Sequence, residues 1–332
     1  MMTYKNYSKE LIINFLNIFK KKSLIVNDTP DFMKAPFREK VVLLKDPFIK
    51  KHCLELIDNG FTVVENSVPI DLIENSVSDF NDWKRRNKTK FHESFYKYDD
   101  KLDRIINLQS VLPIFSEMFS KNKALSVQDF LFQRKTCLYS SLFFEVGSSQ
   151  DIHRDIPLFW TNPGYLYFGT WLALEDTNSK NGPLLVIPGS HKLGLFNRQE
   201  LLKEYKGDKS KIHSTDQDLW NIYQKKVQSE CKKNNLAEIE VHVKKGDTII
   251  WHPMLAHGGK KILDKSLTRL SNVIHTTPEN IPVFHIDTFF DLKKKVPVNA
   301  PWKYKDVNNR KIRDFGGLSI THDKKFDFKT LV

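Results

Sequence analysis

Short runs of β-branched and aromatic residues follow one another through the middle of the chain, and this pattern limits the fold more than any other feature. Gly, Pro and Asn separate most of the runs, which is typical of strands joined by turns. The runs comprise residues 138–146, 165–174, 184–187, 239–243, 248–251 and 270–276. Helical patterns precede them. Helices followed by many short strands favour a mainly β fold, a double-stranded β-helix or jelly roll with N-terminal α-helices packed outside it.

The helical patterns lie in the first third of the chain. Residues 8–21 carry a broad apolar face behind Ser8, which can cap a helix, and they end in lysines that suit a helix C-terminus. Gly60 is placed to end a second helix. The expected order is helix 8–21, a connector over 28–36, helix 46–59, strand 61–65, helix 70–83, a basic loop over 84–97 and helix 112–119.

A polar, lysine-rich insertion occupies residues 196–235, between two of the strands. Its scattered apolar residues, Trp220 among them, predict that it is partly helical. Segments of this length in compact domains are usually lids or binding elements. We therefore divide the chain into an N-terminal helical extension (1–45), a jelly-roll domain (46–280) that contains the lid-like insertion, and a C-terminal segment (281–332) packed on the same domain.

The composition is that of a globular protein from a reducing compartment. The 332 residues are 40% hydrophobic, and Cys53, Cys137 and Cys231 have no CxxC spacing, which argues against a disulfide framework or a zinc knuckle. The sequence contains neither a signal-peptide pattern nor a run of about 18 apolar residues, so we expect a cytoplasmic protein without a membrane span. The formal net charge of +12 fits either a solvated basic surface or attraction of an anionic partner.

A His-x-Asp triplet, His153-Arg154-Asp155, stands at the start of the strand-rich region. If it runs as a strand, His153 and Asp155 project from one face, because side chains alternate with a period of two. An imidazole and a carboxylate side by side are two of the three ligands of a 2-His-1-carboxylate iron(II) site. By itself the triplet is better explained as a polar strand end, because such triplets often arise by chance.

Further motifs follow in a fixed order. GTWLALED (169–176) is a strand that runs into a turn, and NGPLLVIPGSHK (181–192) is a buried strand between two turns. KGDTIIW (245–251) is a tight turn into a strand, and HPMLAHGG (252–259) follows it directly. Arg269 opens the last strong strand. In this order the motifs resemble the phytanoyl-CoA dioxygenase family of iron(II)/2-oxoglutarate oxygenases, over roughly residues 46–278.

The resemblance implies a ligand set and a reaction. It implies that His153, Asp155 and His257 bind Fe(II), that Arg269 binds the far carboxylate of 2-oxoglutarate, and that Trp171 lines the cosubstrate pocket. Three protein ligands leave positions for 2-oxoglutarate and dioxygen, and a guanidinium can hold a carboxylate through two parallel bonds. The implied reaction hydroxylates an unactivated C–H bond of a small molecule.

Two positions depart from the family pattern. Many relatives have a hydroxyl residue two positions after the distal histidine, where this chain has Gly259, so that cosubstrate contact is either absent or supplied by Thr170 or Ser271. Many relatives also have a basic residue where this chain has Glu145.

Alternatives remain for one ligand and for the function. His252, five residues before His257, is a second candidate for the distal ligand, although a polar role at the strand end suits it better.

A non-catalytic jelly-roll module that binds an anionic ligand is the alternative function, but such a module has no need for the metal triad and Arg269 together. Nucleic acid is disfavoured as a partner because the basic residues are scattered and not interleaved with aromatic ones. If the insertion and the C-terminal segment border the site, their lysines favour an anionic or carrier-linked small-molecule substrate.

Overall fold

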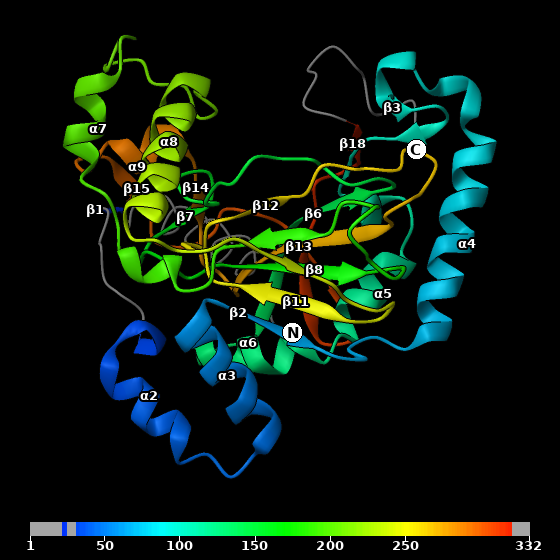
Figure 1. Ribbon diagram of the computed structural model, residues 1–332, viewed down its shortest axis with the longest axis horizontal. Helices are drawn as coiled ribbons and strands as arrows, with labels where there is room; N and C mark the ends of the chain where they lie inside the picture. The colour runs from blue at the N-terminus through cyan, green and yellow to red at the C-terminus, as the bar shows by residue number, and fades with distance from the viewer. Residues whose placement is uncertain (1–21, 25–30, 321–332) are drawn as a thin grey trace, which may run out of the picture.

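A computed structural model describes residues 22–24 and 31–320 of the protein. The predicted helix over residues 8–21 lies outside the described residues. One large sheet runs through the centre of the molecule, in the strand order β16-β17-β6-β13-β8-β11-β2, with β5 paired to β6 and β18 paired to β5 (Figure 1). Its strands are β2 (Phe61–Val64), β5 (Ile105–Ile106), β6 (Thr136–Phe144), β8 (Phe168–Ala173), β11 (Thr248–Trp251), β13 (Ser271–Pro278), β16 (Tyr304–Val307), β17 (Arg310–Arg313) and β18 (Ser319–Ile320). The strands from β6 to β2 pair antiparallel.

A smaller sheet packs on the inner face of the large one. It contains β10 (Ile239–Val241), β9 (Leu184–Val186) and β12 (His257–Gly259), in that order. Trp171 and Ile249 of the large sheet share a buried cluster with Val186 and Val241 of the small one. The register explains this cluster, because Trp171 stands opposite Ile249 on β11 and opposite Val273 on β13. The sequence-based expectation of a mainly β fold is confirmed.

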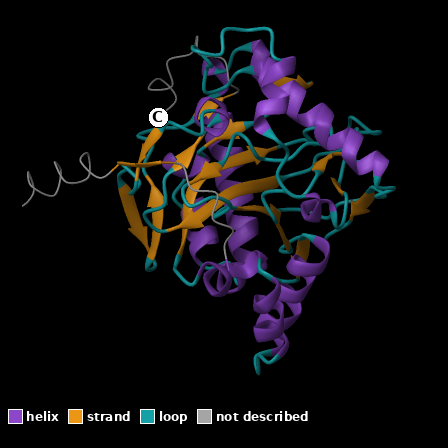
Figure 2. Ribbon diagram, turned by 90° about the vertical axis from the view of Figure 1, so that its left-hand side faces the viewer, coloured by secondary structure: helices purple, strands orange, loops and turns teal. Residues whose placement is uncertain are grey.

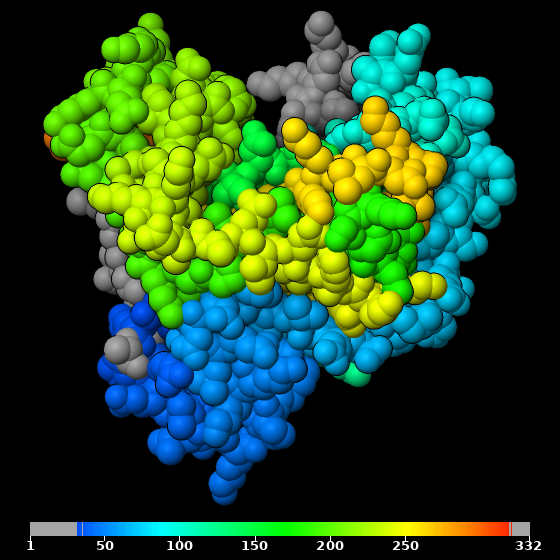
Figure 3. Space-filling view, viewed as in Figure 1, coloured from blue at the N-terminus to red at the C-terminus, as the bar shows by residue number. Residues whose placement is uncertain are grey.

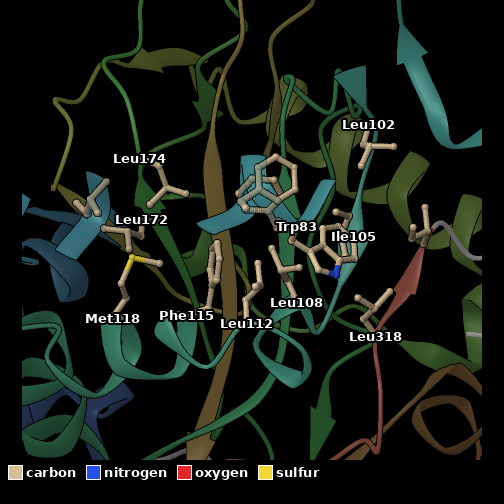
Figure 4. Close-up of a cluster of buried hydrophobic side chains, with 14 of the residues drawn as sticks. Trp83, Leu102, Ile105, Leu108, Leu112, Phe115, Met118, Leu172, Leu174 and Leu318 are labelled. Atoms are coloured by element: carbon tan, nitrogen blue, oxygen red, sulfur yellow. The ribbon is translucent and has the colours of Figure 1, made fainter. Parts of the chain in front are cut away.

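Helices cover the outer face of the large sheet. The described helices are α2 (Ala35–Val42), α3 (Pro47–Asn59), α4 (Ile70–Arg86), α5 (Ile114–Ser120), α6 (Ala124–Phe132), α7 (Arg198–Glu204), α8 (Gln217–Lys233) and α9 (Ile286–Phe290). Leu56 of α3 and Leu131 of α6 pack with Ile250 of β11. Phe80 of α4 packs with Leu172 of β8 in a second cluster, part of which Figure 4 shows. Leu172 therefore faces outward while its neighbour Trp171 faces inward, as the period of a strand requires. In Figure 2 the strands run through the middle of the molecule to its left-hand edge, with helices above and below them.

The boundaries of α3 follow directly from its sequence. The Asp46 carboxylate accepts hydrogen bonds from the amides of Phe48 and Ile49 at 2.9 and 3.1 Å, which satisfies two amides at the start of the helix. Pro47 fits the first helical position because its missing N–H would have no partner there. Gly60 ends the helix in the left-handed region at φ 86°, where a side chain would be strained. The predicted helix 46–59 and its glycine stop are confirmed.

The insertion folds as two helices that pack on the rest of the chain. Leu201 of α7 and Leu219, Tyr223 and Val227 of α8 are buried in one cluster with Trp160. Phe289 of α9 belongs to the same cluster, and its ring lies edge-on to that of Tyr223. The predicted partial helicity of 196–235 is confirmed. In Figure 3 this segment forms a lobe at the upper left, beside the sandwich.

Several local expectations need correction. The sequence pattern missed α2 and α6, and α4 continues to Arg86, into the segment that was expected to be a loop. Its last turn is held by packing of Trp83 and by a bond of 2.9 Å from Arg85 to Asp82.

Short elements complete the fold: β1 (Lys22–Leu24), β3 (Tyr96–Tyr98), β4 (Lys101–Leu102), β7 (Trp160–Thr161), β14 (Val283–Phe284), β15 (Lys295–Pro297) and the 3-10 turns Asp31–Met33, Lys88–Lys90, Glu93–Phe95, Leu108–Ser110 and Ser190–Leu193. Among the described helices, none has the length and apolarity needed to cross a membrane.

Candidate active site

The backbones of His153 and His257 meet in an isolated antiparallel bridge. The amide of each residue donates to the carbonyl of the other, at 2.8 and 2.9 Å, and the two ring centroids lie 4.4 Å apart. The strand considered at His153 is limited to this single bridge, because the chain turns directly after it. The carbonyl of Asp155 accepts from the amides of Leu158 and Phe159, at 2.8 and 3.3 Å. The expected consequence nevertheless holds: His153 and Asp155 point to the same place.

His153, Asp155 and His257 form a buried cluster of three ligand atoms, which all lie within 4.8 Å of one another. Asp155 Oδ1 lies 4.0 Å from Nε2 of His153 and 3.7 Å from Nε2 of His257. Bonds from an ion such as zinc to nitrogen and oxygen donors are about 2.0 to 2.2 Å long, so two donors of one ion can be about 4 Å apart. The spacing therefore fits one shared metal ion.

Hydrogen bonds around the triad leave one atom of each residue free to bind a metal: Nε2 of His153, Nε2 of His257 and Oδ1 of Asp155. Nδ1 of His153 lies 2.8 Å from the carbonyl of Asp151, and Nδ1 of His257 lies 3.0 Å from that of Leu255. Donation from each Nδ1–H leaves the Nε2 lone pairs directed at the centre of the cluster. Asp155 Oδ2 accepts from the hydroxyl of Tyr167 at 2.9 Å and from the indole of Trp251 at 2.8 Å, so Oδ1 is the oxygen left for a metal.

Electrostatics favour a neutral imidazole at His153 and an ionised carboxylate at Asp155. Burial, followed by the neighbouring His257, lowers the pKa of His153 to about 4. Burial raises the pKa of Asp155, but His257, His153, His275 and the indole of Trp251 together bring it below its ordinary value. Neutral imidazole and carboxylate are the protonation states that a first-row divalent ion requires of its ligands. The residues therefore fit an iron(II) ion.

The triad opens into a cavity of about 630 Å³ that also contains Arg269 and Trp171. Arg269 is buried, and its guanidinium carbon lies 5.3 Å from the centroid of the Trp171 ring. Burial lowers the pKa of Arg269 to about 10, although the charge of Glu175 opposes this shift. Nε of Arg269 and Nε1 of Trp171 are buried without a hydrogen-bond partner among the described residues, as is Oγ of Ser271. Such buried donors beside a metal triad fit a bound carboxylate, which would accept their hydrogen bonds.

The two hydroxyl residues that were expected to replace a side chain at position 259 are placed differently. Ser271 lies on the same face of β13 as Val273 and His275, which line the cavity. Thr170 points the other way, toward α6, where its hydroxyl accepts from Gln128 at 2.7 Å. Thr170 therefore does not line the cavity.

The space beside Gly259 is filled by Ser148. A Cβ at Gly259 would collide with Ser148 Oγ, and Ser148 lines the cavity.

Glu145, at the position where many relatives have a basic residue, is paired with Lys84 at 2.8 Å and accepts from the amide of Leu102 at 2.6 Å. Its charge is therefore compensated within the protein.

The alternative distal ligand, His252, lies outside this cavity. It is buried, and with His191 it lines a second cavity of about 510 Å³. Its Nδ1 accepts from the amide of Met254 at 3.1 Å, and burial holds its pKa well below the ordinary value. Of the two histidines, only His257 contributes to the three-residue cluster.

Sequence reasoning missed several residues of the site. Tyr167 precedes Trp171 by four positions on one face of the β8 segment, so the strand period could have identified it. Trp220 of α8, with its ring centroid 5.8 Å from that of His153, and Arg104 carried no local signal. Gln224 of α8 has no signal either, yet its side-chain amide accepts from the amide of Arg154 at 2.8 Å and donates to the carbonyl of Arg154 at 3.0 Å.

Comparison with known proteins places these observations in a family context. The family model "Phytanoyl-CoA dioxygenase (PhyH)" matches residues 57–267. Phytanoyl-CoA dioxygenase from Homo sapiens is 30% identical over 111 residues, which are 33% of this chain and 28% of the human protein. The enzyme from Bos taurus is 24% identical over 185 residues, 53% of this chain and 49% of the bovine one. The chain thus spans less than half the length of these relatives.

Solved structures share the fold at low sequence identity. EctD from S. alaskensis with 2-oxoglutarate and 5-hydroxyectoine has a TM-score of 0.55 and 13% identity, and the alignment covers 88% of this chain and 95% of EctD. The epimerase SnoN, in complex with Fe3+, alpha ketoglutarate and nogalamycin RO, has a TM-score of 0.53 and 13% identity, over 80% of this chain and 98% of SnoN.

Proposed function

Because the chain belongs to the phytanoyl-CoA dioxygenase family, we propose that it is an iron(II)/2-oxoglutarate-dependent dioxygenase that hydroxylates an unactivated C–H bond of a small molecule. The observation that carries this proposal is the placement of a His-Asp-His cluster and a buried arginine in one cavity. We also assign the two packed sheets to a double-stranded β-helix with N-terminal helices outside it.

The proposed reaction balances with one cosubstrate. 2-Oxoglutarate, dioxygen and the substrate R–H give succinate, carbon dioxide and R–OH, so that each oxygen atom of dioxygen ends in one product. Bound iron(II) supplies the activation of dioxygen, which amino-acid side chains do not provide. The protein supplies binding, orientation and the exclusion of water.

Each residue of the site has a defined task in this proposal. His153, His257 and Oδ1 of Asp155 would hold the metal, while Tyr167 and Trp251 fix the orientation of the Asp155 carboxylate. Arg269 would bind the far carboxylate of 2-oxoglutarate through two parallel bonds. Trp171, against the Arg269 side chain, would line the cosubstrate end of the cavity, and Ser271 is placed to add a hydroxyl donor.

Metal loading and cosubstrate turnover test this function together. The purified chain should bind about one equivalent of iron(II), and with the metal it should bind 2-oxoglutarate in anaerobic calorimetry. A screen of metabolite pools for 2-oxoglutarate-dependent succinate release should then identify the substrate. A protein that binds an anionic ligand but neither iron(II) nor 2-oxoglutarate would instead be a binding module, and the proposal would be wrong.

A further inference from the structure

Arg104, immediately before β5, is a second arginine in the cavity that contains the metal triad. Its Nε is buried and has no hydrogen-bond partner, and no residue within 22–24 and 31–320 forms an ion pair with its guanidinium. The adjacent carboxylate, Asp103, is paired with Lys97 at 3.2 Å. Burial lowers the pKa of Arg104 below its ordinary value, although the charge of Asp103 opposes this.

Two arginines away from the cavity show the contrast. Nε of Arg154, which is fully buried, also lacks a partner, but the terminal nitrogens of Arg154 donate to the carbonyls of Gly194 and Ser190 at 2.8 and 2.6 Å. Among the described residues, the guanidinium of Arg104 makes no such bond. Arg310 is paired with Asp129 at 2.7 Å. Burying a charge without a partner is costly, and proteins usually keep such a group where a ligand supplies the opposite charge. Arg104 is therefore a candidate ligand-binding group.

The surroundings of Arg104 connect it to the metal centre. Burial lowers the pKa of His275 to about 4, and the charges of both Asp155 and Arg104 act on this imidazole. Nδ1 of His275 lies 2.8 Å from the hydroxyl of Ser140, and its ring lies 4.2 Å from that of Phe159. His275 is thus within electrostatic reach of both the metal ligand and the arginine. All of these side chains line the same cavity.

We propose that Arg104 binds an oxyanion group, a carboxylate or phosphate, of the hydroxylated substrate. The proposal rests on the function proposed above, in which Arg269 is already assigned to the cosubstrate. The wall of the same cavity includes Tyr139, Leu142 and Phe159, and Trp220 lines it near His153. These apolar and aromatic walls fit a substrate with an apolar body and one anionic end, held so that a C–H bond of the body faces the triad.

Two small probes and one neutral analogue test this inference. The full chain, loaded with iron(II) and 2-oxoglutarate without oxygen, is titrated with benzoate, phenylphosphonate and benzyl alcohol in a calorimeter. We expect at least one anion to bind the unmodified protein, roughly tenfold or more tighter than benzyl alcohol, because a charge-assisted pair is strong in a desolvated site. The preferred anion indicates whether a planar carboxylate or a tetrahedral phosphate fits.

Variants then assign the preference to Arg104. Arg104→Gln should remove it, Arg104→Lys should retain part of it, and Arg134→Gln, the same change at an exposed arginine outside the cavity, should leave it unchanged. If neither anion binds better than benzyl alcohol, or if Arg104→Gln binds the anions as the unmodified protein does, the inference is wrong.

Two controls distinguish substrate binding by Arg104 from a cosubstrate role and from a structural role. Arg104→Gln should bind iron(II) and 2-oxoglutarate normally; loss of 2-oxoglutarate binding would show that Arg104 serves the cosubstrate and would overturn the inference. The variant should also unfold at the same or a higher temperature, because it loses an unpaired charge, and a clear decrease would reveal a structural role instead. If the unmodified protein binds neither iron(II) nor 2-oxoglutarate, the proposed function fails.

Discussion

At the scale of single residues, alanine substitutions test the assignment of the metal ligands, and a substitution of His252 is the control. Ala at His153, Asp155 or His257 should each reduce iron(II) affinity by roughly a hundredfold or more, since each change removes a direct ligand from a cluster of three. Metal content after dialysis measures this loss. Circular dichroism should show that the variants remain folded.

The control is His252→Ala, which removes a buried histidine that lies outside the cluster. This variant should keep full metal content, although it can lose stability because a buried side chain is truncated. Full metal content in His257→Ala combined with loss in His252→Ala would transfer the distal role to His252.

Arg269 offers a second test at the same scale. Arg269→Lys keeps a positive charge but loses the forked geometry, so 2-oxoglutarate affinity should decrease about tenfold to a hundredfold while iron(II) binding persists. Calorimetry with 2-oxoglutarate measures the change. The cations that could substitute are engaged elsewhere: Lys260 is paired with Glu240, and Lys265 lies 5.1 Å from the ring centroid of Tyr98. Unchanged affinity in the variant would remove Arg269 from the cosubstrate site.

At the scale of elements, the sequence predicted what local patterns encode. Strands such as β11 (Thr248–Trp251) were predicted with correct bounds, because β-branched runs between turns have few alternatives. The strand considered at His153 does not extend beyond one bridge, because the next residue pairs with a side chain: Gln224 accepts from the amide of Arg154 and donates to its carbonyl. A partner 70 residues away depends on how the insertion folds back, and no local pattern records that. Arg104 was missed for the same reason.

The contact between α8 and the ligand segment makes the insertion a support for the metal site. Gln224→Ala should leave two polar groups of Arg154 unpaired and should destabilise the protein by about 1–3 kcal/mol. Because Arg154 stands between His153 and Asp155, the iron(II) affinity should decrease as well, about tenfold. Urea unfolding and metal titration measure the two effects.

A matched change on the same helix distinguishes a local effect from general damage to α8. Gln228 is exposed and donates to the carbonyl of Ile152 at 2.8 Å. Gln228→Ala should therefore change stability and metal affinity only slightly, because water can replace the lost bond. If both glutamine variants bind iron(II) as the unmodified protein does, α8 does not position the ligands.

At the scale of the whole molecule, charge is concentrated in segments that reach the cavity. From residue 260 to the end there are 15 Lys and Arg against 8 Asp and Glu. Thr215 and Gln217, near and at the start of α8, line the cavity, as do His285 and Phe315 of the C-terminal segment. Among the described residues, the insertion and the C-terminal segment therefore both border the site, as electrostatic steering requires. Several lysines of these segments, including Lys225, Lys293 and Lys295, are exposed.

The surface lysines and Arg104 should act on different steps of binding. Exposed charges are screened beyond about 10 Å at 0.1 M salt, so they should raise the association rate of phenylphosphonate only at low ionic strength. Stopped-flow tryptophan fluorescence should show this rate decreasing as salt is added, and glutamate at Lys225, Lys293 and Lys295 should reproduce the decrease at low salt. Arg104, whose Nε is buried in the cavity wall, should instead set the dissociation rate, so Arg104→Gln should release the probe faster at every ionic strength. An association rate that is indifferent to both salt and charge reversal would assign the +12 charge to solubility alone, and recognition of the anion would then depend on Arg104.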